Sequence, residues 1–355
     1  MITMEELLAL MVRQGGSDLH LSVGSPPRIR VDGMLLPVEH DALDSDATRR
    51  LATSILTSDQ IAKLDRDLEL DCSFGLEGLG RFRVNVFFQQ GTVAGVLRSI
   101  PSAIPNFEML GMPQEVCRRI CGLHSGLVLV TGATGSGKST SLAAMIDYVN
   151  VNRQAHIVTI EDPVEFTHQH KNCMITQREV GGDTRSFKNA LRSVLRQDPD
   201  IVLVGELRDL ETVEAALTLA ETGHLTFGTL HTSDAVQTMN RIIDVFPSHQ
   251  QSQIRTMLSF TLEAVFSQKL LPSATGKGRC LAAEVLIATP GVRALIRDGK
   301  AHQVYSQIQT GGRLGMTTMA QSLSRLVIAR RVKQADAEAV LSDPSELRAS
   351  VAAAA

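Results

Sequence analysis

The chain has 355 residues, more than one hydrophobic core usually holds, so its length predicts two domains. Apolar residues make up 43% and charged residues 21%, which excludes a disordered or fibrous protein, and a net charge of −3 without basic runs argues against a nucleic-acid translocase without excluding one. No stretch is long and apolar enough to span a bilayer, and the N-terminus lacks the basic region of a signal peptide, so we expect a cytoplasmic protein.

The first hundred residues predict an α+β domain with an antiparallel meander, because short alternating patterns are separated by glycines and other turn residues. The predicted elements are strands at 18–22 and 28–32, a helix at about 45–64, and meander segments at 68–74, 80–90 and 92–100. Pro101 and Pro105 follow, and proline also restricts the residue before it, so an extended chain is expected here. We therefore place the first domain at residues 1–100 and a linker at 101–111.

Residues 112–355 predict a second domain, of the α/β class. Continuous apolar strands alternate with helical segments, a pattern typical of a parallel sheet covered by helices on both faces. The predicted strands are 127–130, 157–160, 201–204 and 225–229. From Pro290 onward the pattern is mainly helical with a break at Gly311 and Gly312, and the terminal SVAAAA has no feature that predicts order.

The first predicted strand of this domain runs into a phosphate-loop motif, G-x-x-x-x-G-K-[ST], which a helical pattern follows. Glycines allow such a loop to curl until successive N–H groups point at phosphate, and the helix N-terminus adds partial positive charge. Lys138 is expected to reach the β and γ phosphates and Ser139 to bind Mg²⁺. We predict that ATP is held by Gly132, Ala133, Thr134, Gly135, Ser136, Gly137, Lys138, Ser139 and Thr140.

Acidic residues follow the next two predicted strands, where the carboxyl ends of parallel strands line a ligand crevice. Glu161 comes directly after its strand and is placed to act on Mg²⁺ or on its bound water, whereas Glu165 is more simply explained as a solvated loop residue. Glu206 ends a Walker B pattern in which Gly205 occupies the usual metal-facing Asp position. Glu206 is therefore predicted to orient or deprotonate the attacking water.

Histidines flank the last predicted strand of the sheet. His231 follows its C-terminal end, where it could donate a hydrogen bond to the γ-phosphate, and His224 lies at the opposite end, farther from the crevice. A satisfied core histidine is the competing interpretation for both. Phosphoryl transfer also needs cations beyond the loop lysine, and the candidates are Arg81, Arg83, Arg98, Arg192, Arg196, Arg208 and Arg241.

Four motifs, or boxes, thus follow one another: the phosphate loop, the acidic box at Glu161, the Walker B box at Glu206 and the histidine box around His224 and His231. In this order they resemble the secretion ATPase superfamily, and most closely the PilT-like retraction ATPases of type IV pili. Besides the phosphate loop, the similar segments are GSDLHL (16–21), PPRIRVDG (26–33), GRFRVNVF (80–87), TIEDPVEF (159–166), VGELRD (204–209) and ETGHLTFGTLHT (221–232). The resemblance implies a PAS-like N-terminal domain, a RecA-like ATPase domain, and a homohexamer with nucleotide held between domains and subunits.

The resemblance also implies roles for particular residues. It makes Glu206 the catalytic glutamate, Glu161 the Asp-box acid and His231 a phosphate-sensing residue. Among the arginines it favours Arg83 and Arg98 from the N-terminal domain and Arg241 from the ATPase domain, as contacts to the nucleotide.

Retraction rather than assembly is the direction that the resemblance implies. Assembly ATPases of the superfamily carry an extra N-terminal domain and a tetracysteine module, and neither is seen in this sequence. Residues 291–298 resemble the AIRNLIRE helix of retraction motors, with differences at its first, fourth and last positions, or they form a simple packing helix. Residues 167–171 are similar to PilU-type accessory ATPases and residues 308–316 to PilT itself, so both branches stay open.

We therefore expect a hexameric Mg²⁺-dependent ATP hydrolase that drives type IV pilus retraction and twitching motility at the cytoplasmic face of the inner membrane. Its implied partners are further copies of itself, an inner-membrane pilus platform protein and a paralogous retraction ATPase. A PilU-type accessory or a regulatory ring subunit that binds nucleotide is the alternative. A nucleic-acid translocase is a less favoured one.

Overall fold

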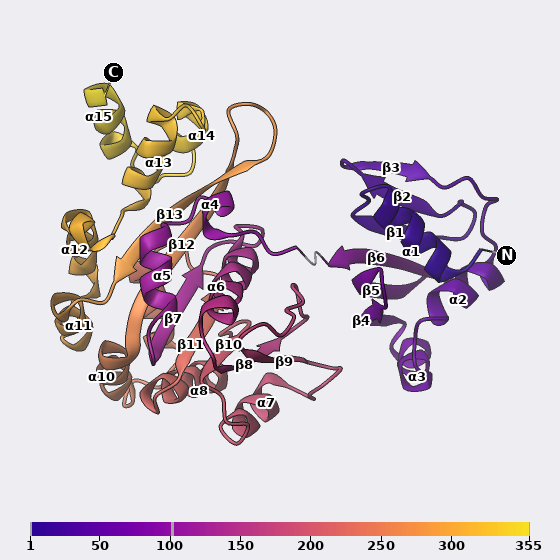
Figure 1. Ribbon diagram of the computed structural model, residues 1–355, viewed down its shortest axis with the longest axis horizontal. Coiled ribbons are helices and arrows are strands. Elements are labelled where there is room, and N and C mark those ends of the chain that lie inside the picture. Colours follow the sequence, from indigo (N-terminus) through magenta and orange to yellow (C-terminus); the bar gives the residue numbers. More distant parts are fainter. Residues whose placement is uncertain (1, 101–102, 355) are drawn as a thin grey trace. The chain divides into compact units, whose positions relative to one another are not determined.

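The computed structural model describes residues 2–100 and 103–354 and divides into two compact units (Figure 1). Unit 1 contains Met1–Ala103, Pro163–Thr167 and Glu179–Asp183, and unit 2 contains Ile104–Asp162, His168–Arg178 and Thr184–Ala355. Of the segment predicted as a linker, residues 101 and 102 lie outside the described residues, and Phe107–Leu110 form the short helix α4.

Unit 1 is built on a six-stranded sheet in the order β3-β2-β1-β6-β5-β4, in which every neighbouring pair is antiparallel. Helix α1 contributes buried Leu7, Leu8 and Met11 to a core that includes Leu19 and Phe82 of the sheet. The elements are α1 (Met4–Arg13), β1 (Asp18–Leu21), β2 (Arg28–Val31), β3 (Met34–Pro37), α2 (Ser45–Thr53), α3 (Ser58–Asp67), β4 (Glu69–Leu76), β5 (Gly80–Gln89) and β6 (Thr92–Ile100). The predicted α+β class and the antiparallel meander are confirmed.

The single helix predicted at 45–64 was wrong, because two helices, α2 and α3, occupy this segment. Thr57 is the N-cap of α3: its hydroxyl accepts from the Gln60 N–H at 3.3 Å, and Gln60 Oε1 accepts from the Thr57 N–H at 2.9 Å. This capping box needs an extended backbone at Thr57, which interrupts a continuous helix. Helix α1, which was not predicted, begins with the same device at Thr3 and Glu6.

Unit 2 contains a seven-stranded sheet in the order β13-β12-β7-β11-β10-β8-β9. Neighbouring pairs from β12 to β8 are parallel, and β13 pairs antiparallel with β12. The elements after α4 are α5 (Gln114–Cys121), β7 (Gly126–Thr131), α6 (Lys138–Asn152), β8 (His156–Glu161), β9 (Met174–Glu179), α7 (Phe187–Val194), β10 (Ile201–Val204), α8 (Leu210–Glu221), β11 (Leu225–Leu230), α9 (Ala235–Asp244), α10 (Gln251–Thr261), β12 (Leu262–Pro272), β13 (Arg279–Ile287), α11 (Pro290–Arg297), η1 (Ala301–Gln303), α12 (Val304–Thr310), η2 (Gly312–Leu314), α13 (Met319–Ile328), α14 (Gln334–Glu338) and α15 (Ser345–Ala354).

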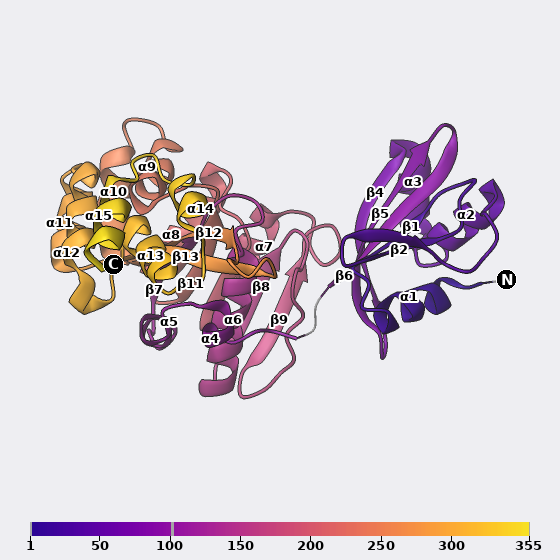
Figure 2. The same cartoon turned by 90° about the horizontal axis from the view of Figure 1, so that it is seen from above.

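The central strands of this sheet are buried on both faces, which explains their continuous apolar sequences. In β7, Val128 and Val130 pack in one core with residues of α5 and α6. The alternate residues Leu127 and Leu129 are equally buried and face the opposite side, where α8 contacts the strand. Figure 2 shows α8, α9 and α10 on one side of the strands and α4, α5 and α6 on the other. The predicted parallel sheet with helices on both faces is confirmed.

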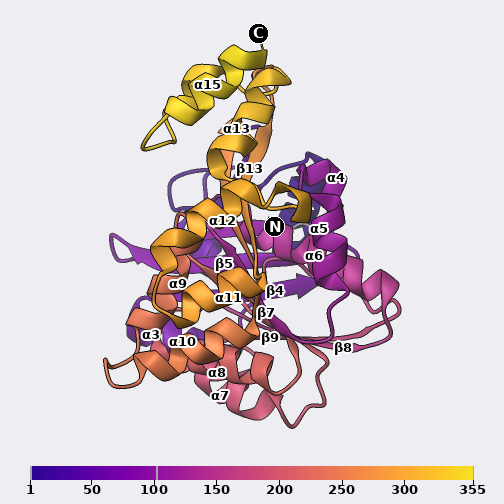
Figure 3. The ribbon, with the colours of Figure 1, turned by 90° about the vertical axis from the view of Figure 1, so that its left-hand side faces the viewer.

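The C-terminal helices lie along the β13 edge of the sheet, where α13 contacts β13 and α15 packs on α13 (Figure 3). The helical break predicted at Gly311 and Gly312 is confirmed. The expectation that SVAAAA lacks order was wrong for residues 350–354, which are the last residues of α15, and Ala355 lies outside the described residues. Leu347 of the same helix is fully buried in a cluster with Leu323. No helix in the described part of the chain combines the length and the apolar character needed to cross a membrane.

Candidate nucleotide-binding site

The four sequence boxes meet at one edge of the unit 2 sheet. Strands β7, β11, β10 and β8 are consecutive neighbours and run parallel. The phosphate loop follows β7, His231 follows β11, Glu206 follows β10 after one intervening residue, and Glu161 is the last residue of β8. The last residues of β7 and β11 are paired, so the register brings the phosphate loop and His231 to the same level.

Three glycines give the phosphate loop a backbone that other residues rarely adopt. The φ angles are +142° at Gly132, +78° at Gly135 and +91° at Gly137. Gly132 also packs closely, because a Cβ there would lie 2.5 Å from the carbonyl oxygen of Gln268. Gly137 is the N-cap residue of α6 and has no side chain with which to cap the first turn. The N–H groups of that turn are therefore suited to an anionic ligand.

Lys138 and Ser136 line the inner side of the loop. Lys138 Nζ donates to the carbonyl oxygens of Gly132 at 2.8 Å and Ala133 at 3.1 Å, so the side chain curls back over the loop. Ser136 is 6% exposed, and none of the described residues provides a partner for its buried Oγ. An ammonium group and a buried hydroxyl both suit bound phosphate. Of the other predicted contacts, Ser139 and Thr140 are partly buried, and Ala133, Thr134 and Gly135 are exposed.

Glu206 lies between two basic side chains. Its Oε2 is 2.7 Å from Nε of Arg208, and its Oε1 is 3.2 Å from Nε2 of His231. The glutamate side chain is 21% exposed and that of the histidine 47%, so both can meet a ligand at the ends of β10 and β11. Glu206 and His231 were predicted separately from the sequence, and the structure brings them into direct contact.

Glu161 approaches the Walker B strand closely because Gly205 has no side chain. A Cβ at Gly205 would lie 3.1 Å from the carbonyl oxygen of Ile160 and 3.3 Å from Cα of Glu161. Glu161 Oε1 accepts hydrogen bonds from Thr159 Oγ1 at 2.7 Å and from Gln177 Nε2 at 3.3 Å. The glycine in place of the usual Asp therefore has a packing reason. Gln177 was missed by sequence reasoning, and no motif around it indicates this contact.

His224 lies at the other end of β11 from this group. Its Nδ1 is 3.0 Å from the carbonyl oxygen of Leu219 and 3.1 Å from Oγ1 of Thr222. These contacts close the turn between α8 and β11. They favour the structural interpretation of His224, and the structure does not bring this residue to the phosphate loop.

The three arginines favoured as nucleotide contacts lie in both units. Arg83 and Arg98 are directly opposite each other on β5 and β6 of unit 1, and Arg98 Nε is 2.7 Å from Oδ1 of buried Asp18. Burial opposes ionisation of Asp18, but hydrogen bonds from Ser17 and Arg98 lower its pKa. Arg83 is exposed, as is Arg241 in the last turn of α9 in unit 2.

The segment that resembles the AIRNLIRE helix forms α11, as expected, and its first arginine is a structural contact. Arg293 Nη2 is 2.7 Å from Oε1 of Glu263. The same guanidinium donates to three backbone carbonyl oxygens, those of Ser259 at 3.0 Å, Phe260 at 2.8 Å and Ala288 at 3.1 Å. It therefore fixes α11 against the end of α10.

The chain matches the family described as "Type II/IV secretion system protein" over residues 2–351. It is 52% identical over 322 residues to the type IV pilus retractation ATPase PilT of Pseudomonas aeruginosa, and the aligned residues cover 91% of this chain and 93% of that protein. It is 42% identical over 344 residues to the type IV pilus ATPase PilU of the same organism, covering 97% and 90%. A crystal structure of the pilus retraction motor PilT with bound ADP has a TM-score of 0.92 at 47% identity, covering 98% of this chain and all of that one.

The similarity to the ADP-bound structure agrees with the geometry of the phosphate loop. It extends over both units, so the N-terminal α+β unit and the RecA-like ATPase unit belong to the shared fold. The chain belongs to the type II/IV secretion ATPase family, in which it is a PilT-like, nucleotide-binding ATP hydrolase.

Proposed function

We propose that this chain is the hexameric motor that retracts type IV pili, and so drives twitching motility, by Mg²⁺-dependent ATP hydrolysis. The observation that carries the proposal is its 52% identity to a protein named as a pilus retraction ATPase, over 91% of the chain. The lower identity of 42% to PilU favours the principal motor over the accessory role.

The oxygen atoms at the site fit a magnesium ion that arrives with its nucleotide. Among the described residues, no group of three or more His, Cys, Asp or Glu could hold a metal ion by itself. Magnesium in nucleotide sites typically takes one or two protein oxygens and completes its shell with phosphate oxygens and water. The Ser139 hydroxyl, in the first turn of α6, and the Glu161 carboxylate, at the end of β8, are suitable ligands. Bound there, the ion would neutralise charge on the β and γ phosphates.

Each residue of the site then has a role in the hydrolysis. Lys138 exchanges its bonds to loop carbonyl oxygens for the β and γ phosphates, and the backbone N–H groups of the loop hold the same phosphates. Glu206 orients the attacking water and receives its proton. His231, which contacts Glu206 directly, registers the presence of the γ-phosphate. Glu161 would hold the Mg²⁺, directly or through a water molecule.

Arginines supply the remaining positive charge in this proposal. Arg83 and Arg98 are directly opposite on neighbouring antiparallel strands, where like charges repel each other. The Asp18 carboxylate, 2.7 Å from Arg98 Nε, offsets one of the two charges, and the exposed side chain of Arg83 can meet a further anion. We assign both arginines, with Arg241, to nucleotide phosphates in an assembled homohexamer. Release of phosphate would then relax this contact and change the arrangement of the domains, which is the mechanical output. The load is a pilus platform protein, met at the cytoplasmic face of the inner membrane.

Deletion of the gene tests the proposal in the cell. Retraction predicts that surface fibres accumulate and that twitching stops, with recovery on expression of the wild-type chain. Expression of Glu206→Gln should leave the fibres in place, because this variant binds ATP and does not hydrolyse it. Loss of fibres on deletion would contradict retraction and indicate assembly.

The accessory PilU-type role is the second candidate, because the similarity to PilU extends over 97% of this chain. In that role the ring would support another retraction ATPase. Complementation distinguishes the two: a Glu206→Gln chain that restores twitching as well as wild type would favour the accessory role.

A further inference from the structure

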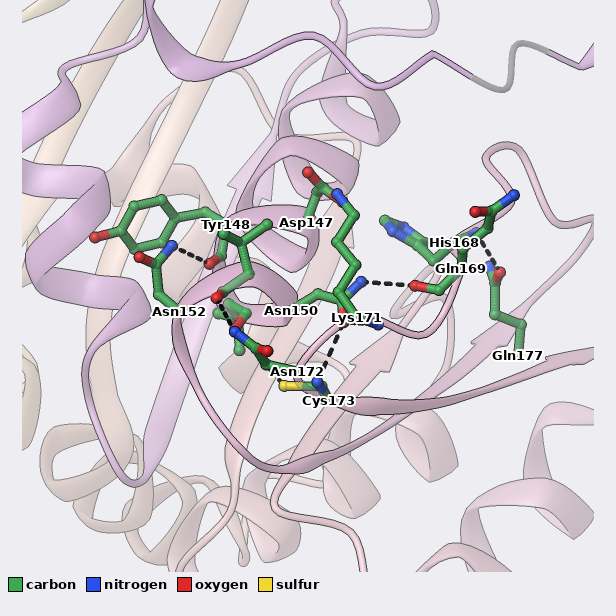
Figure 4. Close-up of polar contacts among 12 residues, drawn as sticks. Asp147, Tyr148, Asn150, Asn152, His168, Gln169, Lys171, Asn172, Cys173 and Gln177 are labelled. Carbon is green, nitrogen blue, oxygen red and sulfur yellow. Dashed lines mark hydrogen bonds and ion pairs between the residues drawn. The ribbon is translucent and has the colours of Figure 1, made fainter.

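The segment His168–Cys173, which leads into β9, is fastened to the C-terminal half of α6. Figure 4 shows its polar contacts with that helix. Lys171 Nζ is 2.6 Å from Oδ1 of Asp147, and the Asn172 amide donates to the carbonyl oxygen of Val151. Helix α6 is the one that begins at the phosphate loop.

Asn150 is the centre of this attachment, and its side chain is fully buried. Its Nδ2 donates to the carbonyl oxygen of Gln169 at 2.8 Å, while its Oδ1 accepts from the Lys171 N–H at 3.1 Å and from the Cys173 N–H at 3.4 Å (Figure 4). The Asn150 carbonyl oxygen also accepts from the Asn172 N–H at 3.0 Å. One buried residue thus satisfies four backbone groups of the segment and fixes its position on α6.

The same segment is hydrogen-bonded to Gln177, and Gln177 is hydrogen-bonded to Glu161. The His168 N–H donates to Gln177 Oε1 at 2.7 Å (Figure 4), and Gln177 Nε2 donates to Glu161 Oε1 at 3.3 Å. The backbone N–H can only donate, and an ionised carboxylate can only accept. A neutral amide satisfies both at once, which explains why glutamine rather than glutamate suits this position.

We propose that Gln177 is a positioning residue for Glu161, and that Asn150 supports it by holding His168–Cys173 on α6. Together with the backbone of His168–Cys173, these hydrogen bonds connect the phosphate-loop helix to the Glu161 carboxylate at the end of β8. The phosphate loop and the Glu161 carboxylate must keep a fixed separation for phosphoryl transfer. This inference rests on the catalytic role of Glu161 in the proposed function.

The discriminating variant is Gln177→Glu, in the full-length chain. It keeps an oxygen that accepts from the His168 N–H, and it replaces the N–H group facing Glu161 by a second carboxylate oxygen. We expect kcat for ATP hydrolysis to fall by about tenfold to 100-fold, the usual cost of losing a supporting contact. KM for ATP, and ADP affinity measured by calorimetry without Mg²⁺, should stay within about twofold of wild type because the phosphate loop is untouched. Gln154→Glu, a matched change at an exposed position, should leave all three unchanged.

A double-mutant cycle separates positioning from a general structural effect. If Gln177 acts through Glu161, adding Gln177→Glu to Glu161→Gln causes no further loss of kcat, whereas independent effects would multiply. A Gln177→Glu chain with wild-type kcat, beside a Glu161→Gln chain with a reduced but measurable kcat, would overturn the inference and leave the role of Glu161 intact. An active Glu161→Gln would instead overturn the proposed role of Glu161. Multiplicative losses in the double variant would also refute positioning.

Discussion

Replacing Gly132 by alanine should destabilise the phosphate loop before any nucleotide is bound. The backbone here has φ = +142°, and an added Cβ would lie 2.5 Å from the carbonyl oxygen of Gln268 and 2.5 Å from Oγ of Ser136. Strain of the backbone costs roughly 1–3 kcal/mol. Displacement of the packed strand β12 adds about 1–3 kcal/mol. The free energy of unfolding should therefore fall by about 2–6 kcal/mol.

Gly135→Ala is the matched control for this prediction. Its φ is +78°, and an added Cβ would meet nothing within 4 Å, so only the left-handed backbone cost of about 1–2 kcal/mol remains. Urea unfolding of both variants, without nucleotide, measures the difference. If Gly132→Ala proved as stable as Gly135→Ala, the close contact between the loop and β12 could not have the importance we assign to it.

Two further predictions concern stability. Burial lowers the pKa of His168 to about 4. Between pH 6.5 and about 4 the folded chain therefore binds fewer protons than the unfolded chain. The free energy of unfolding should fall by up to roughly 3 kcal/mol as the pH drops through this window. Urea unfolding of His168→Gln should show a smaller fall, whereas exposed His249→Gln should match wild type. Arg293→Ala should lose about 2–4 kcal/mol of unfolding free energy because Glu263 and three carbonyl oxygens lose their donor, and exposed Arg297→Ala should lose under about 0.5 kcal/mol. Equal losses in the two arginine variants would contradict the assigned packing role.

Strands with continuous apolar sequences could be predicted to within a residue or two, since burial on both faces leaves a plain pattern. Strand β12 was not predicted, because it contains Ser267 and Gln268, which are buried yet polar. Ser267 hydrogen-bonds Thr131 at 2.9 Å, and Gln268 donates to Ser141 at 2.8 Å. These partners lie more than a hundred residues away, so nothing local indicates that the polar groups are satisfied.

The residues of the candidate site also differ in whether a local motif indicates them or whether they depend on contacts between distant segments. The phosphate loop is local, and its glycines and lysine could be identified from spacing alone. The contact between Glu206 and His231 depends on β10 and β11 being neighbours, which the sequence predicts only as part of a general parallel sheet. The contact between Gln177 and Glu161 depends on how the intervening segment returns along α6, and no pattern in that segment reports it.

In the proposed function, the loop around Lys138 binds ATP while Glu206 prepares the water that attacks its γ-phosphate. The most direct measurement is phosphate release by wild type and by Glu206→Gln, with ATP affinity measured by calorimetry on the same samples in the presence of Mg²⁺. We predict that Glu206→Gln keeps ATP affinity within a few-fold and loses at least about 100-fold in kcat. A wild-type chain that binds no ATP would contradict the role of the phosphate loop, and a Glu206→Gln chain that hydrolyses ATP at the wild-type rate would contradict the role of Glu206.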